Sequence, residues 1–106
     1  MAAEAKGLID ESVKRHGELV GKVGGAFASS GGPGGGNETT ALDIVKALLI
    51  HGMIVQWDAA GDHYGPIAVG APDERSRNEC RRFGRRLCAL VLRLARCARA
   101  GRKAVY

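Results

Sequence analysis

The chain has 106 residues, with 16 Lys and Arg against 11 Asp and Glu, which gives a formal net charge of +5. This length allows one domain at most, and 45% hydrophobic with 25% charged residues is typical of a globular fold and excludes a wholly disordered chain. No apolar run approaches the roughly 20 residues that a membrane-spanning helix needs, and the first residues lack the pattern of a secretory signal.

The first half of the chain predicts a helix, a strand and a second helix. Residues 4–20 carry apolar residues at spacings of three and four, which predicts a helix that ends at Gly21. Residues 22–29 are short, apolar and rich in small residues, as in a buried strand. The densest glycine cluster follows at residues 30–37, which we call the glycine-rich loop. Asn37 is a favoured helix N-cap, and the apolar spacing behind it predicts a helix to Ile50.

The second half predicts one more strand and a long helix. Residues 53–57 indicate a strand, and residues 58–72 a turn-rich connection. A helix then begins at Asp73 or Ser76, with an apolar stripe formed by Cys80, Phe83, Leu87, Val91, Leu94 and Ala98. Strands separated by a helix pair in parallel through a right-handed crossover. The sequence therefore predicts an α/β fold with a parallel sheet, and with only two strands one edge of that sheet should lie open.

The three cysteines argue against both a disulfide scaffold and a metal site. Cys80, Cys88 and Cys97 are odd in number, lie in one predicted helix and show no CxxC spacing. We therefore expect reduced thiols, a cytoplasmic protein and no bound metal. Cys80 lies on the apolar stripe, which predicts a buried and inert thiol.

The glycine-rich loop is the first candidate for a ligand site. It follows a predicted strand at the carboxyl edge of the sheet, where α/β folds bind ligands, and it precedes a helix N-terminus that favours anions. The loop ends in Gly36, Asn37 and Glu38, so it lacks the lysine of a Walker motif. Asn37 also stands where the dinucleotide fingerprint requires glycine. From the glycines alone, a structural turn explains the loop as well as a ligand site does.

The exact sequence adds a more specific indication. Three strings carry it in this order: GKVGGAFASSG at residues 21–31, GGGNETT at 34–40 and HGMIV at 51–55. Together with HYG at 63–65 and RRFGRRL at 81–87, they resemble the flavodoxin-like family. The similarity is greatest to NAD(P)H:quinone oxidoreductases of the tryptophan-repressor-binding-protein type. It covers residues 6–95, and residues 96–106 remain as a basic tail.

This resemblance implies a three-layer fold and a flavin cofactor. Family members have a five-stranded parallel sheet, bind FMN at the carboxyl ends of the strands, and carry electrons or pass hydride from NAD(P)H to quinones. The implied partners are thus a quinone or a redox protein. The flavin does the chemistry, so no catalytic side chain is expected. The positions that match flavin contacts of the family are Ser29, Ser30, Gly31, Gly32, Pro33, Gly34, Gly35 and His51.

The resemblance also implies that much of a flavodoxin-like domain is missing. The chain matches the C-terminal half, without the first strand, its phosphate-binding loop, or the third strand. FMN would lose the charge-assisted hydrogen bonds to its phosphate, so we expect weak or no FMN binding by this chain alone. A second copy of the chain, or a complementary N-terminal half, is the expected partner.

Other interpretations stay open at this stage. His51 is also explained by the dipole at a helix end, and His63 and Tyr64 fit either a flavin edge or a structural loop. An open strand edge suggests a non-catalytic subunit that associates through it. Residues 73–106 carry 11 basic and 3 acidic residues, a net +8, which suggests nucleic acid. Phe83 is the only aromatic residue of the helix, so a solvated basic face is the preferred explanation.

Overall fold

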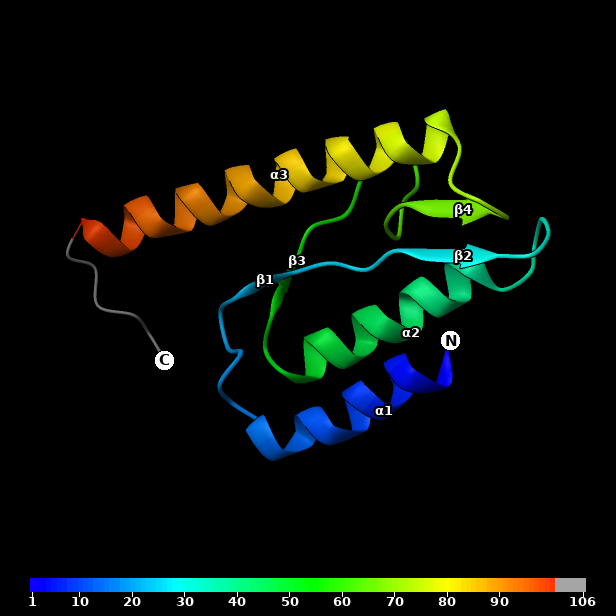
Figure 1. The fold of residues 1–106 in the computed structure, drawn as a ribbon. Helices are drawn as coiled ribbons and strands as arrows, with labels where there is room; N and C mark the ends of the chain where they lie inside the picture. Colours follow the sequence, from blue (N-terminus) through cyan, green and yellow to red (C-terminus); the bar gives the residue numbers. More distant parts are fainter. Residues whose placement is uncertain (101–106) are drawn as a thin grey trace.

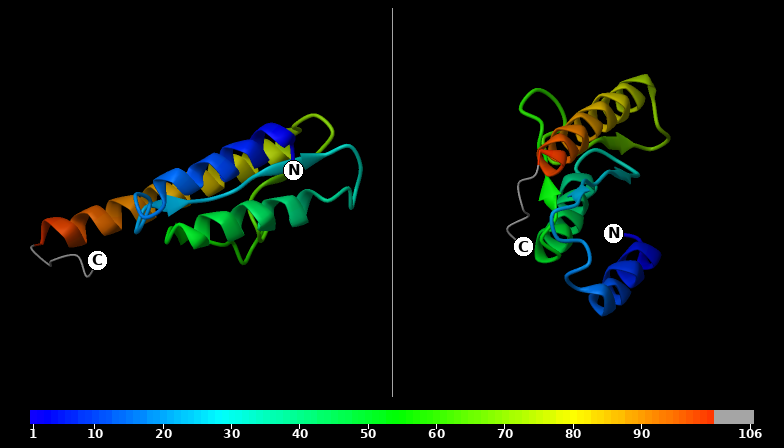
Figure 2. Two further views of the ribbon diagram at one scale, coloured as in Figure 1. Left: turned by 90° about the horizontal axis from the view of Figure 1, so that it is seen from below. Right: turned by 90° about the vertical axis from the view of Figure 1, so that its left-hand side faces the viewer.

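The structure is a computed structural model that describes residues 1–100, and it places helices on both sides of short parallel strands (Figures 1 and 2). Strand β1 (Val23–Gly24) pairs with β3 (Ile54–Val55), and β2 (Ala28–Ser30) pairs with β4 (Ile67–Val69). Helix α3 covers one side of the strands, and α2 and α1 lie on the other. The predicted α/β class and the parallel pairing are confirmed.

The strand predicted at residues 22–29 is divided into β1 and β2 at the point where the backbone around Gly65 crosses close to it. Gly65 lies so near Ala26 that a Cβ on Gly65 would overlap the carbonyl oxygen of Ala26. The segment therefore pairs with β3 before this crossing and with β4 after it. Strand β4 lies within the connection predicted at 58–72, where three residues are too few to show an alternating pattern. Strand β3 is also shorter than the predicted 53–57.

Helix α1 (Ala3–Ser12) ends earlier than predicted and continues as a single 3-10 turn, η1 (Val13–Arg15). The prediction of a helix to residue 20 is wrong, because the chain leaves the helical conformation at His16, with a ψ of 132°, and at Gly17, with a φ of 92°. No residue of α1 is buried, and Leu8 is 73% exposed. Hydrophobic contact therefore contributes little to holding this helix.

Helix α2 (Asn37–Ile50) supplies most of the buried core. Ala41 and Val45 pack against Ala26, with Ile44 and Tyr64 at the border. The predicted limits of α2 are confirmed, but the N-cap is Gly36 with a φ of 85°, rather than Asn37. A left-handed backbone at this position leaves the Asn37 side chain available for other contacts.

Helix α3 (Glu74–Arg99) begins where the sequence predicted, because the Asp73 carboxylate accepts a hydrogen bond from the Ser76 amide at 2.8 Å. Its apolar stripe packs on β1 where Gly25 leaves room for the ring of Phe83. The prediction of a buried Cys80 is wrong: this thiol is exposed, because it borders an open groove instead of a closed core.

The long helix predicted from the apolar stripe, whose last member is Ala98, continues to Arg99. Residues 101–106 of the basic tail lie outside the described part of the chain. None of the helices in residues 1–100 combines the length and the apolar character that crossing a membrane would require.

Candidate functional site

The glycine-rich loop connects the carboxyl end of β2 to the N-terminus of α2, as predicted. Its own hydrogen bonds fasten it: the Ser30 hydroxyl donates to the carbonyl of Gly32 at 2.8 Å, and the Gly35 amide donates to the same carbonyl at 3.1 Å. The amide of Gly70, just after β4, donates to the Ser30 carbonyl at 2.7 Å. The start of the loop is therefore held from within and from the neighbouring strand.

Asn37 is a loop anchor that the sequence interpretation assigned to a different role. Its side chain is buried, its Nδ2 donates to the Ser30 hydroxyl at 3.1 Å, and its Oδ1 accepts from the Glu38 amide at 2.8 Å. An amide side chain can donate and accept hydrogen bonds at once, whereas a helix N-cap needs only the acceptor. The signal in the sequence is a cap-type residue that directly follows a glycine, since the glycine itself can take the cap position.

The outer surface of the loop is open to a ligand. A Cβ at Gly31, Gly32 or Gly34 would meet nothing within 4 Å. Ser29 and Pro33 are exposed beside them. The amides at the start of α2 add donors and partial positive charge. These features fit the polar edge of a planar or anionic ligand.

His51 lies at the other end of α2 and is not brought together with the loop. A helix of 14 residues is about 21 Å long, so the two features are separated by the length of α2. His51 is buried, and its Nε2 lies 2.8 Å from the Ser12 hydroxyl. Ser12 in turn donates to the carbonyl of Ile9 at 2.6 Å. The hydroxyl proton of Ser12 is thus engaged with the Ile9 carbonyl. Nε2 of His51 is therefore the donor in the Ser12–His51 hydrogen bond, and His51 does not act as a base on Ser12.

Comparison with known proteins gives clear relatives, although no family model matches. The chain is 43% identical over 82 residues to a flavodoxin of Aquifex aeolicus, a match that covers 71% of this chain and 44% of the flavodoxin. It is 32% identical over 103 residues to an NAD(P)H dehydrogenase (quinone) of Archaeoglobus fulgidus, covering 89% of this chain and 54% of the relative.

The chain is a homologue of the flavodoxin-like proteins. A third relative, an NAD(P)H quinone oxidoreductase of Candida albicans, is 36% identical over 81 residues, which are 74% of this chain and 36% of that protein. The chain therefore spans about half the length of the curated relatives it matches, or less. The described residues contain parallel strands and the glycine-rich loop between β2 and α2.

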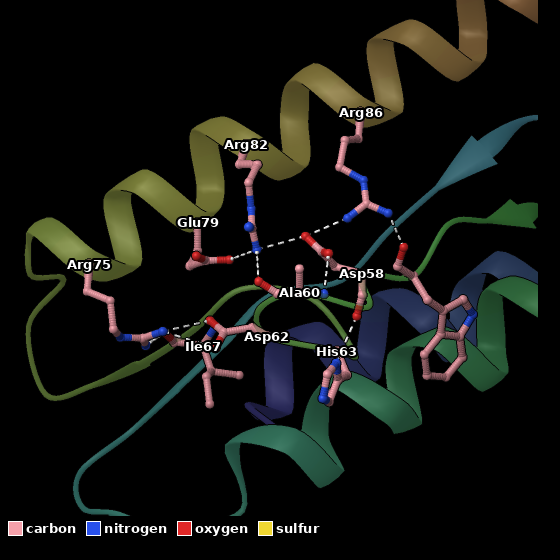
Figure 3. Close-up of polar contacts among 10 residues, drawn as sticks. Asp58, Ala60, Asp62, His63, Ile67, Arg75, Glu79, Arg82 and Arg86 are labelled. Carbon is pink, nitrogen blue, oxygen red and sulfur yellow. Dashed lines mark hydrogen bonds and ion pairs between the residues drawn. The ribbon is translucent and has the colours of Figure 1, made fainter.

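A cluster of ion pairs fixes the connection between β3 and β4 in this flavodoxin-like chain (Figure 3). The Asp58 carboxylate lies 2.8 Å from Nη2 of Arg82 and 2.5 Å from Nη1 of Arg86, and it accepts a hydrogen bond from the Ala60 amide at 2.8 Å. We call Asp58, Arg82 and Arg86 the arginine clasp. The Ala60 amide, together with Arg86 and Arg82, holds the pKa of Asp58 below its usual value.

A second ion pair positions β4 itself. Asp62 accepts from the amide of Ile67 at 2.9 Å and pairs with Arg75 at 3.0 Å, while Arg75 also donates to the carbonyl of Ile67 at 2.7 Å. The sequence interpretation placed these arginines on a solvated face. The signal it missed is the presence of two aspartates in the connection and arginines along one side of the following helix.

His63 and Tyr64 take structural positions. Tyr64 makes an edge-to-face contact with Trp57, with ring centroids 5.2 Å apart, and borders the core. The Nδ1 atom of His63 lies 2.8 Å from the carbonyl oxygen of Asp58. Of the two interpretations left open by the sequence, these contacts match the structural loop.

Proposed function

We propose that the chain is part of an FMN-binding flavoprotein of the electron-transfer or NAD(P)H:quinone oxidoreductase type. The glycine-rich loop carries this proposal, since it is fastened from within and open outward at the carboxyl end of a parallel strand. Relatives named flavodoxin and NAD(P)H dehydrogenase (quinone) support it. The proposed contacts are residues 29–35, whose amides and hydroxyls would orient one edge of the flavin ring. FMN, when bound, would supply the redox chemistry.

The phosphate of FMN has to be held by residues outside this chain. A phosphate needs several amide or cationic donors directed at one point, which the loop, shaped around one carbonyl of Gly32, does not provide by itself. We therefore expect measurable FMN affinity only when the rest of a flavodoxin-like domain is present, with NAD(P)H and a quinone as substrates of that assembly. His51 remains a predicted contact that lies away from the loop within one chain.

A glycine substitution tests the proposal. A Cβ at Gly35 would lie 2.9 Å from the Gly32 oxygen and 3.0 Å from Cβ of Ser30, so Gly35→Ala should distort the loop. We expect this variant, complemented with the missing part of the domain, to bind FMN at least about tenfold more weakly in a fluorescence titration. Gly84→Ala, where a Cβ meets nothing within 4 Å on α3, is the matched control.

Two outcomes of this titration would contradict the proposal. A folded, complemented protein that stays colourless with excess FMN shows that the domain binds no flavin. Equal affinities of Gly35→Ala and Gly84→Ala show that the flavin binds away from the glycine-rich loop.

A further inference from the structure

The C-terminal half of α3 extends beyond the packed part of the protein. The helix has 26 residues and is about 39 Å long, and its last turns reach past the strands and the other helices (Figures 1 and 2). Among the described residues of α3, only Ser76, in the first turn, is buried. The second half of the helix therefore exposes most of its circumference.

Apolar side chains continue into this exposed half, on a side of the helix that is not limited to the packed stripe. Cys88, Val91, Leu92 and Ala95 are all exposed and recur at spacings of three and four, so they lie together; we call them the apolar face. Val91 is 48% exposed and Leu92 55%. Leu92 is turned by about 200° from Leu94 of the stripe, so the layer beneath the stripe does not cover Leu92.

Three arginines border the apolar face without acidic partners. Arg85, Arg96 and Arg99 are placed four or seven residues from Leu92, which puts them beside it on the helix. The ion pairs that α3 forms within residues 1–100 include none of the three. No Asp or Glu follows Glu79 in the sequence. The surface thus combines exposed apolar side chains with a positive border.

This combination narrows the class of partner. A second copy of the chain, with a net charge of +5, would bring the same arginines together and is disfavoured by repulsion. The phosphates of a nucleic acid attract arginines but give Val91 and Leu92 no apolar contact. An anionic lipid surface satisfies both features, because apolar side chains enter the acyl boundary while arginines remain at the headgroups.

We propose that the C-terminal half of α3 binds the surface of an anionic lipid bilayer. The helix lies in the interface, with the apolar face toward the acyl chains and the three bordering arginines at the lipid phosphates. The arginine clasp ties the first half of α3 to the connection between β3 and β4, so the helix is already formed before it meets the lipid. This binding goes beyond the proposed flavin function and does not require it.

Co-sedimentation with lipid vesicles tests the proposal. The probe is a vesicle of phosphatidylcholine with about 30% phosphatidylglycerol, and vesicles of phosphatidylcholine alone are the lipid control. We expect the chain to bind the anionic vesicles at least about tenfold more tightly than the neutral ones, with an affinity that falls as salt is added.

A charge series identifies the surface that is used. Arg85→Gln, Arg96→Gln and Arg99→Gln together should weaken binding to the anionic vesicles at least about tenfold, because each cation near such a surface contributes roughly fivefold. The control makes the same change in net charge at exposed positions of η1 and α2, and should alter the affinity less than about threefold. Its substitutions are Lys14→Gln, Arg15→Gln and Lys46→Gln.

An apolar pair separates lipid from nucleic acid. Val91→Ser with Leu92→Ser should weaken vesicle binding at least about fivefold, because these side chains no longer gain from leaving water, and should leave any retention on duplex DNA unchanged. Leu8→Ser with Val13→Ser replaces the same residue types at exposed positions on the N-terminal side of the chain and is the control. Circular dichroism checks that each variant keeps its helices.

Four results would overturn the proposal. Absent binding, or equal binding to neutral and anionic vesicles, excludes an anionic lipid surface as the partner. Vesicle binding that survives the three arginine substitutions assigns it to another part of the chain. Retention on duplex DNA at concentrations that leave vesicles unbound assigns the arginines to nucleic acid. A dimeric mass by light scattering that is lost in Val91→Ser with Leu92→Ser assigns the apolar face to a second copy.

Discussion

Gly65 shows how much of this fold depends on a single residue. It has a φ of 115° and lies against the carbonyl of Ala26, at the point where β1 ends and β2 has not yet begun. This contact brings the connection between β3 and β4 onto the central segment, so that β4 can pair with β2. Nothing in the local sequence indicates the contact, because it depends on two segments that are almost 40 residues apart along the chain.

We expect Gly65→Ala to destabilise the protein strongly. A left-handed backbone costs an L-residue about 1–2 kcal/mol, and the overlap with the Ala26 backbone adds to this cost, for a total of about 3 kcal/mol or more. Gly70→Ala is the matched control, with a φ of 68° and open space around its Cβ, and should cost about 1 kcal/mol. Urea denaturation measures both, and equal losses would show that the close crossing is not required.

The arginine clasp predicts a dependence of stability on acid. The pKa of Asp58 is lower in the folded protein than its usual value of 3.8, so Asp58 contributes stability above that pH and loses it as the pH falls through the folded value. The free energy of unfolding should therefore decrease below about pH 4. Asp58→Asn should lower the free energy of unfolding at pH 7 and make its decrease with falling pH less steep.

Urea denaturation between pH 3 and 7 tests the clasp. Asp43→Asn is the control, because Asp43 pairs with one exposed lysine, Lys46, on α2. A decrease of the same steepness in Asp58→Asn and in the unsubstituted protein would exclude the clasp as its source.

At the scale of elements, capping and periodicity predicted α2 and α3, while tertiary contacts decided the rest. The limits of both helices are indicated by residues close to their ends, such as the Asp73 cap of α3. Strand β4 and the division of the central segment depend on Gly65 and on the Asp62–Arg75 pair, which no local pattern contains. Arg75, Arg82 and Arg86 are occupied by internal ion pairs, so part of the basic character of α3 is structural.

The candidate site was predicted to a similar extent. The position of the glycine-rich loop followed from strand and helix order, and it is where the sequence placed it. Its anchoring by Asn37 and Gly70 could not be derived, because both hydrogen bonds require knowledge of how the Ser30 side chain and β4 lie. The distance of His51 from the loop does follow from the predicted length of α2.

Helix α1 should open more easily than the other helices. Its polar links to α2 are the Ser12–His51 hydrogen bond and the contact of Met1 with Thr40. We expect Ser12→Ala to speed hydrogen exchange of α1 amides by about five- to tenfold, in line with one lost hydrogen bond of about 1 kcal/mol.

Hydrogen exchange with mass spectrometry measures this local effect. Glu11→Ala removes only a surface pair with Lys14 and serves as the control. Identical exchange in Ser12→Ala and Glu11→Ala would show that the link through His51 does not hold the helix.

The whole molecule exposes more surface than a compact monomer of the same mass. It exposes 7462 Å², whereas a folded monomer of 11.1 kDa exposes about 5,700 Å². The buried hydrophobic residues are small, namely Ala26, Ala41, Val45 and Ala68. The large apolar side chain of Phe27 is 75% exposed. The described residues thus form one side of a core, which agrees with a chain about half as long as its relatives.

Ser29 and Gly35 are proposed flavin contacts, and both also line a groove of about 760 Å³ between α1 and α3. Two binding events that share residues in this way are thermodynamically linked, and such a linkage is reciprocal. By whatever factor an occupant of this groove increases the affinity for a flavin, the flavin increases the affinity for that occupant. The cofactor would then favour filling of the groove, because the occupant would bind most tightly at flavin concentrations that load the site.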